Sequence, residues 1–207
     1  MEVELIAITP DPEKVIEQAG RTCYLSFDKI SEGSEKRFVR MVVRNGHHSV
    51  LEHAVATFRI KGVSRACTHQ LVRHRLASYS QQSQRYVNEK DFRVVEPDSI
   101  AAKPEAHAIF EKTIESCREA YRALKETGIR NEDARFILPN AVHTEIIISA
   151  NFRQWRHMIS LRGQKASQWE IRRLMLKILA ILKEHAPTVF EDMEVDEDDA
   201  TVSLGSL

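Results

Sequence analysis

The hydrophobic pattern predicts a mixed chain of strands and helices. Alternating or β-branched apolar positions indicate strands, and apolar positions spaced by three and four residues indicate helices. The strands are expected at residues 2–8, 54–63 and 143–150. The helices are expected at residues 12–24, 35–45, 64–75, 104–127, 131–137, 151–161 and 167–185. Because these elements show no βαβ rhythm, the pattern predicts an α+β fold in which helices pack on a small, mainly antiparallel sheet, with long helices in the C-terminal half.

Two of these helices carry a continuous apolar stripe that should face a core. The stripe of the helix that begins at Pro104 is Phe110, Ile114, Cys117, Tyr121 and Leu124. The stripe of the last helix is Ile171, Leu174, Met175, Ile178 and Leu182.

Ser64 is placed to cap the helix expected at residues 64–75, because its hydroxyl can accept from the first free backbone N–H groups. This helix would end in Arg73-His74-Arg75, and residues 76–86 would form a loop after it.

Composition separates an ordered body from an acidic tail. The chain has 207 residues, 43% of them hydrophobic, so residues 1–190 are expected to form one domain. Seven acids lie in residues 191–199, which leaves 23 acids against 30 Lys and Arg in the rest of the chain. The body is therefore about +7, which suits an anionic ligand. Residues 191–207 lack an apolar period and are expected to form a flexible tail.

The chain is expected to be cytoplasmic, because it has no apolar run of bilayer length and no basic signal segment at its start. Cys23, Cys67 and Cys117 have no paired metal-type spacing and are expected to be reduced thiols.

The stretch RHRLASYSQQSQRY, residues 73–86, concentrates hydrogen-bond donors in one loop. Arginine forks grip phosphate in a bidentate manner, and serine hydroxyls and loop N–H groups add neutral donors. A phosphate clamp is the functional interpretation, while composition alone leaves open a solvated basic loop.

The spacing Arg73-His74-Arg75, seven residues and then Ser83 resembles the signature of flavin-dependent thymidylate synthases. The resemblance extends over most of the chain, in the order and at the intervals typical of the family. The matching blocks are AGRTCYLS at 19–26, GHHSVLEH at 46–53, ARFILP at 134–139, NFRQWRHMISLR at 151–162 and SQWEIR at 167–172.

The resemblance implies reductive methylation of deoxyuridine monophosphate (dUMP) to thymidine monophosphate (dTMP). In this family 5,10-methylenetetrahydrofolate donates the carbon, reduced FAD donates a hydride and NADPH reduces the flavin. The reaction uses no cysteine nucleophile. A homotetramer with active sites shared between subunits is implied, with neither nucleic acid nor membrane as a partner.

The resemblance also implies roles for individual residues. Arg162 is expected to be catalytic, because a fixed cation beside the pyrimidine stabilises negative charge that develops in the ring. His47 is expected near the folate. The residues implied for dUMP are Gln70, Arg73, Gln81, Gln82, Ser83, Gln84, Arg85, Arg135 and Arg162. Those implied for FAD are Ser49, Glu52, Arg73, His74, Arg75, Gln81, Asn151, Arg153 and His157.

Four positions, at three places in the chain, depart from the family pattern. Many members have Asn-Glu where this chain has Ser80-Gln81, so a carboxylate is replaced by an amide. Cys23 stands where some relatives have serine, and His157 where some have asparagine.

Other classes of function remain open from the residues. A nucleic-acid-binding protein is compatible with the positive body and with Tyr79, Tyr86 and Phe92 as stacking groups. A flavin reductase would use the same FAD residues without transferring carbon. A metal site is not expected, because the histidines lack ligand spacing, and Ser83 suits a phosphate donor better than a nucleophile.

Overall fold

The computed structural model describes residues 1–205, which fall into two compact units. The first unit comprises residues 1–2, 60–70 and 80–146, and the second comprises residues 3–59, 71–79 and 147–205. Each unit is assembled from separate stretches of the chain. The predicted boundary at residue 190 is a different division, and it stays a prediction.

A four-stranded sheet has the order β1-β2-β4-β3. Its strands are β1 (Glu2–Ile8), β2 (Val55–Ser64), β3 (Ser78–Gln81) and β4 (His143–Asn151). The pattern predicted β1, β2 and β4 within one or two residues of these bounds. It missed β3, which lay in the predicted loop.

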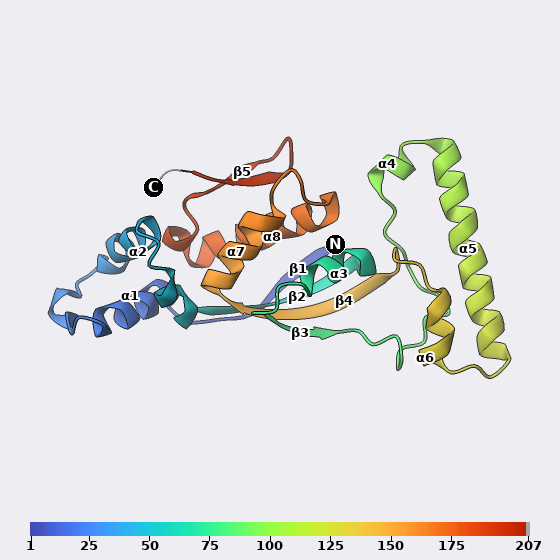
Figure 1. Cartoon of the computed structure of the whole chain (residues 1–207), viewed down its shortest axis with the longest axis horizontal. Helices are drawn as coiled ribbons and strands as arrows, with labels where there is room; N and C mark the ends of the chain where they lie inside the picture. The colour runs from blue at the N-terminus through green and yellow to red at the C-terminus, as the bar shows by residue number, and fades with distance from the viewer. Residues whose placement is uncertain (206–207) are drawn as a thin grey trace. The chain divides into compact units, whose positions relative to one another are not determined.

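Helices of the second unit lie beside β2 (Figure 1), on the face that carries the buried side chains of Ala56 and Phe58. Trp155 of α7 (Phe152–Arg162) donates from its indole N–H to the Ala56 carbonyl at 3.1 Å, and its ring meets Phe58 edge to face. α8 (Trp169–His185) packs against α7, and all five residues of its predicted stripe are fully buried. The unit also contains α1 (Pro12–Thr22), η1 (Phe27–Lys29), α2 (Ser34–Arg44), η2 (His48–His53) and η4 (Pro187–Val189).

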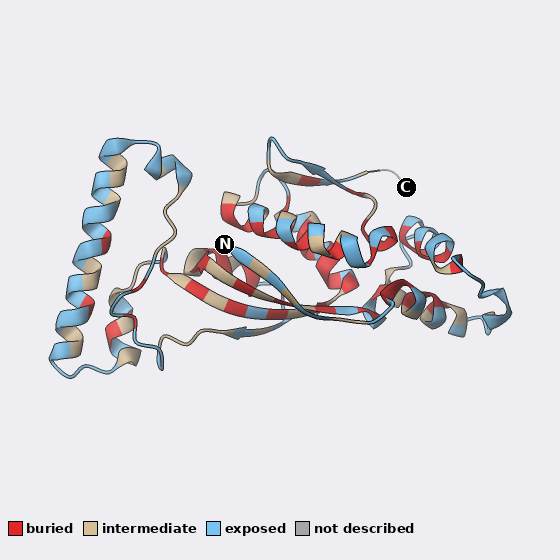
Figure 2. Cartoon of the chain, turned by 180° about the vertical axis from the view of Figure 1, so that it is seen from behind, coloured by how far each residue is buried: buried red, intermediate tan, exposed pale blue. Residues whose placement is uncertain are grey.

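The first unit is built around α5 (Pro104–Glu126). Ile114 and Tyr121 are buried, Phe110, Cys117 and Leu124 are partly buried, and the opposite face of α5 is exposed (Figure 2). A small core forms where Phe92 and Val142 meet Ile114. α3 (Arg65–Leu71), α4 (Asp98–Ala101), α6 (Asn131–Ala134) and η3 (Arg135–Ile137) complete the helices of this part of the chain. The α+β class is confirmed.

α3 is shorter than predicted because its C-terminal end is held by a side chain. Its start agrees with the sequence, since Ser64 Oγ accepts from the Cys67 N–H at 3.0 Å. The helix ends at Leu71, and the Tyr79 hydroxyl lies 2.7 Å from the Leu71 carbonyl oxygen and 3.0 Å from that of His74. Arg73-His74-Arg75 therefore follows the helix rather than ending it.

The acidic segment contains a hairpin that the sequence analysis did not expect. β5 (Met193–Asp196) pairs antiparallel with β6 (Thr201–Leu204), with Val195 opposite Val202. Met193 and Val202 are buried, and Val202 N–H donates to the Gly163 carbonyl at 2.9 Å. Alternation of a few apolar residues with acids is enough to pair strands when one face is covered. The predicted tail extends over residues 191–207, of which residues 206–207 lie outside the described part.

Candidate functional site

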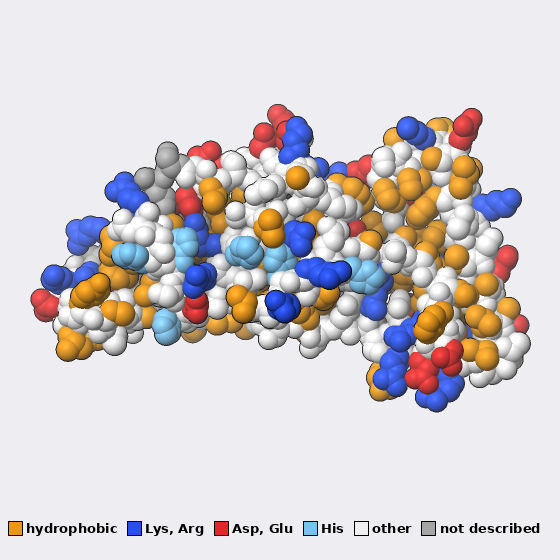
Figure 3. All heavy atoms as spheres, viewed as in Figure 1, with side chains coloured by type: hydrophobic (Ala, Val, Ile, Leu, Met, Phe, Trp, Pro, Cys, Tyr) orange, Lys and Arg blue, Asp and Glu red, His pale blue; other side chains and the backbone are white. Residues whose placement is uncertain are grey.

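A pocket of about 990 Å³ lies in the second unit, lined by residues from four parts of the sequence. η2 contributes His48 and Glu52, and the segment after α3 contributes residues 73–76. Asn151 and α7 supply another wall, and Met193 and Leu204 come from the β5–β6 hairpin. Figure 3 shows histidine and basic side chains gathered on the face of the molecule where α7 lies in Figure 1.

The N-terminal turn of α7 presents several polar groups to this pocket. Asn151 caps the helix, because its Oδ1 accepts from the Gln154 N–H at 2.8 Å. Arg153 and His157 are one turn apart, and both are exposed and line the pocket. Arg153 Nη1 lies 2.6 Å from Glu52 Oε1, so two residues implied for FAD already contact each other. Both side chains are about half exposed, and such a pair adds at most about 1 kcal/mol to stability.

His74 is the buried residue of the arginine-rich segment. Only 6% of it is exposed, whereas Arg73 and Arg75 on either side are exposed and available to an anion. Arg162 Nε donates to His74 Nε2 at 2.9 Å, and the His157 ring lies 5.8 Å away, centroid to centroid. Burial, together with the charges of Arg162 and His157, lowers the pKa of His74 to about 4. The ring is therefore neutral near pH 7, and because Nε2 accepts, its proton is on Nδ1.

Arg156 also lines the pocket, but its guanidinium is paired with a carboxylate of the protein itself. It contacts the Val189 carbonyl and forms a bidentate ion pair with Asp192, with Nη1–Oδ1 at 2.7 Å and Nη2–Oδ2 at 2.6 Å. Both side chains of this pair are only 8% exposed. Arg156 therefore fixes the start of the hairpin segment to α7, and Met193 beside it lines the pocket.

The first unit holds most of the residues implied for dUMP. Arg85 Nη2 lies 3.1 Å from Glu132 Oε2, and Arg135 Nε donates to the Glu132 carbonyl at 3.0 Å, so both arginines meet at one residue. Gln81 Nε2 donates to Thr68 at 2.9 Å and to Thr144 at 3.2 Å. Ser83 Oγ accepts from the Arg85 N–H at 3.2 Å, and Gln70 Nε2 donates to the Ala66 carbonyl at 3.3 Å. Gln84 is partly buried.

The pocket includes seven of the nine residues implied for FAD, namely Glu52, Arg73, His74, Arg75, Asn151, Arg153 and His157. The other two, Ser49 and Gln81, do not line it, and neither does His47. Arg162 does not line the pocket, but it donates a hydrogen bond to His74, which does.

Several residues that line the pocket were not expected from the sequence: His48, Leu76, Gln154, Arg156, Ser160, Met193 and Leu204. His48 lies within a quoted block, next to His47, so its position was a usable signal. Met193 and Leu204 gave no such signal, because their segment was expected to have no regular structure.

Within residues 1–205, no three His, Cys, Asp or Glu side chains are grouped as metal ligands. No helix in the same range is both long and apolar enough to cross a membrane.

Comparison with known proteins adds independent findings. The family model described as thymidylate synthase complementing protein matches residues 4–188. The chain is 46% identical over 200 residues to the flavin-dependent thymidylate synthase of Geobacter sulfurreducens, covering 93% of this chain and 86% of that protein. It is 42% identical over 198 residues to that of Mycolicibacterium vanbaalenii, covering 87% and 79%.

A solved structure from the same family has a similar fold. A crystal structure of Thymidylate Synthase X from Helicobacter pylori with FAD and dUMP matches with a TM-score of 0.80 and 28% identity. The match covers 93% of this chain and 98% of that one. Together with the arginine-rich pocket, these matches show that the chain belongs to the thymidylate synthase complementing protein family, the flavin-dependent thymidylate synthases.

Proposed function

We propose that the pocket of the second unit binds FAD and that the protein converts dUMP to dTMP by reductive methylation. The observation that carries the proposal is the pocket itself, which brings together seven of the nine residues implied for the flavin. Methylenetetrahydrofolate is the proposed carbon donor and NADPH the proposed reductant, in a cytoplasmic enzyme. The flavin supplies hydride-transfer chemistry, and the protein supplies binding and orientation.

The chemistry of the lining residues fits a dinucleotide. Arg73, Arg75 and Arg153 offer exposed guanidinium groups to a pyrophosphate, which accepts bidentate hydrogen bonds. Asn151 and His157 offer neutral polar contacts, with Ser49 and Gln81 as further proposed FAD residues. At His157, imidazole replaces the amide of some relatives, so the geometry of this contact differs.

For dUMP we propose Gln70, Gln81, Gln82, Ser83, Gln84, Arg85 and Arg135 of the first unit, and Arg73 and Arg162 of the second. Arg85 and Arg135 both contact Glu132, and a phosphate would compete with Glu132 for these cations. Gln81 already donates to two threonines, so its amide has a fixed direction.

We propose Arg162 as the group that activates the pyrimidine. A cation held in one orientation stabilises negative charge that develops in the ring, and thus makes C5 reactive without a cysteine nucleophile. The bond from its Nε to His74 holds the guanidinium plane. His47, which is exposed, is proposed to contact the folate.

A homotetramer with shared sites is part of the proposal. Each unit exposes large apolar side chains: Tyr24 and Leu25 in the second unit are 84% and 79% exposed, and Tyr86 and Phe136 in the first are 79% and 82% exposed. A partner subunit that covers these side chains would remove their apolar surface from water, which favours assembly.

The test is an anaerobic visible spectrum of the protein with FAD, to which NADPH is added, followed by dUMP and methylenetetrahydrofolate. The expected result is bleaching by NADPH, recovery of the flavin spectrum on adding both substrates, and dTMP in the final mixture. Bleaching without dTMP would instead indicate a flavin reductase. Absence of bound flavin would overturn the proposal, and binding of nucleic acid would then be measured as a function of salt.

A further inference from the structure

Gln82, one of the residues proposed for dUMP, is fixed at three points within the first unit. Its backbone N–H donates to the Glu145 carbonyl at 2.9 Å, and its own carbonyl accepts from Arg65 Nη1 at 3.2 Å. Its side-chain Nε2 donates to Glu89 Oε1 at 3.0 Å. The two backbone contacts place the residue, and within residues 1–205 the contact with Glu89 is the one that orients the amide.

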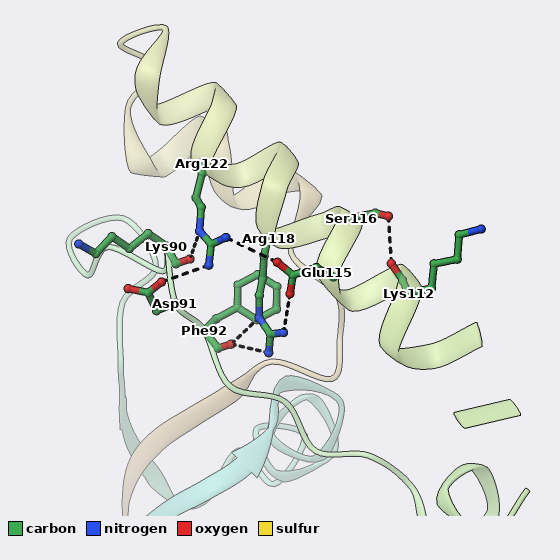
Figure 4. A network of polar contacts seen from close by, with 8 residues as sticks. All are labelled: Lys90, Asp91, Phe92, Lys112, Glu115, Ser116, Arg118 and Arg122. Carbon is green, nitrogen blue, oxygen red and sulfur yellow. Dashed lines mark hydrogen bonds and ion pairs between the residues drawn. The ribbon is translucent and has the colours of Figure 1, made fainter. Parts of the chain in front are cut away.

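Glu89 is in turn held rigidly by α5. Only 6% of Glu89 is exposed, and its backbone N–H donates to the hydroxyl of the fully buried Tyr121 at 3.2 Å. The residues after Glu89 are tied to the same helix (Figure 4): Arg118 donates to the Phe92 carbonyl and covers its ring, and Arg122 donates to the Lys90 carbonyl. Glu89 therefore has a fixed backbone position from which its carboxylate reaches Gln82.

A buried carboxylate at this position is costly for the fold. Burial raises the pKa of Glu89, and Arg65 and Gln82 only partly oppose the shift. A neutral side chain of the same shape would avoid the cost of burying the charge. Glu89 lines a cavity of about 420 Å³ together with Gln82 and Thr144, so it lies at a polar wall rather than inside an apolar core.

We propose that Glu89 is a positioning residue that sets the direction of the Gln82 amide for dUMP binding. A carboxylate only accepts hydrogen bonds, so it selects the NH₂ end of the Gln82 amide and directs the carbonyl end away from itself. A glutamine at position 89 can accept or donate, and it would allow both directions of the Gln82 amide. This inference rests on the proposed dUMP site.

The test compares Glu89→Gln with the wild type in three measurements on the full-length, FAD-loaded protein: the KM for dUMP, the FAD content and the unfolding temperature. We expect KM to rise about tenfold, as is typical when a hydrogen bond to a charged group loses its direction. FAD content should stay the same, and the unfolding temperature should change little, because the cost of burying the charge disappears together with its attraction to Arg65. A residue that served only the fold would give the opposite pattern, a lower unfolding temperature with the KM unchanged.

A double-mutant cycle shows whether Glu89 acts through Gln82. Gln82→Ala should raise the KM by a similar factor, and adding Glu89→Gln to it should change the KM less than about twofold. Glu119→Gln, which removes the same charge from an exposed position of α5, is the matched control and should leave the KM unchanged.

Two results would each overturn the positioning role alone. One is a wild-type KM for dUMP in Glu89→Gln. The other is a double variant in which the KM rises by the product of the two single-variant factors. A wild-type protein that makes no dTMP would overturn the proposed function and this inference together.

Discussion

The bond between Arg162 and His74 connects the residue proposed to activate the pyrimidine with a residue that lines the proposed flavin pocket. Arg162 Nε is 2.9 Å from His74 Nε2. The neutral His74 ring accepts this hydrogen bond, and the positive charge stays on the Arg162 guanidinium. Substitution Arg162→Ala should lower the rate of dTMP formation about 100- to 1,000-fold, as is typical for loss of one preorganised electrostatic contact. FAD binding should change little, because Arg162 does not line the pocket. Turnover and flavin absorbance measured on the same preparation check this, and equal losses of both would contradict the assigned role.

His74 also makes stability depend on pH. Its pKa is about 4 in the folded protein and 6.5 in an unperturbed chain, so below pH 6.5 the unfolded state binds a proton that the folded state does not. The free energy of unfolding should therefore decrease as the pH falls from about 6.5 towards 4, whereas the titration of His74 does not change it above pH 6.5.

His74→Gln keeps an acceptor for Arg162 but cannot titrate. Urea unfolding near pH 7 and pH 5 should therefore show a smaller decrease in the free energy of unfolding for this variant than for wild type. His53→Gln, at an exposed histidine, should keep the wild-type decrease. Identical decreases in His74→Gln and wild type would contradict the shift.

At the scale of elements, the sequence predicts what depends on periodicity. The stripe of α8 is fully buried as expected, and α5 begins at Pro104 and ends just before Gly128. The sequence fails where a contact distant in the chain decides the outcome. At the end of α3 the Tyr79 hydroxyl lies beside the Leu71 carbonyl, and no local signal around Leu71 reveals this contact. Single residues of the site could be predicted only through the family resemblance, because spacing alone did not separate a phosphate clamp from a solvated basic loop.

The segment that leads into the β5–β6 hairpin forms a buried ion pair with α7, which makes the role of this contact testable. Asp192 pairs with Arg156, and each side chain is 8% exposed, so Asp192→Ala leaves a buried guanidinium without its counter-charge. The expected cost is about 3 kcal/mol in the free energy of unfolding. FAD affinity should also weaken, because Met193 and Leu204 of this hairpin line the pocket. Urea unfolding and flavin titration measure both effects. Asp198→Asn, at an exposed position between the strands, should change neither, and an unaffected Asp192→Ala would show that the hairpin is held by other contacts.

At the scale of the whole molecule, the two units carry different parts of the proposed chemistry. The pocket proposed for the flavin is lined by residues of the second unit, whereas seven of the nine residues proposed for dUMP belong to the first. His47 and Ser49 are exposed and lie outside the lining of the pocket, although both are proposed to contact the ligands. A tetramer with shared sites would account for this, because His47 and Ser49 would complete a site whose Arg73 belongs to another chain.

Mixing inactive variants tests whether sites are shared. His47→Ala and Arg73→Ala should each be inactive alone. If one site takes His47 and Arg73 from different chains, random hybrid tetramers restore both residues in roughly a quarter of the sites. Activity should therefore return after the two variants are dissociated together and reassembled. The matched control mixes Arg73→Ala with Arg75→Ala. These residues line the same pocket of one chain, so every hybrid site keeps one defect and no activity should return. No recovery in the first mixture, with hybrid tetramers demonstrated by mass, would mean that each chain supplies its own His47.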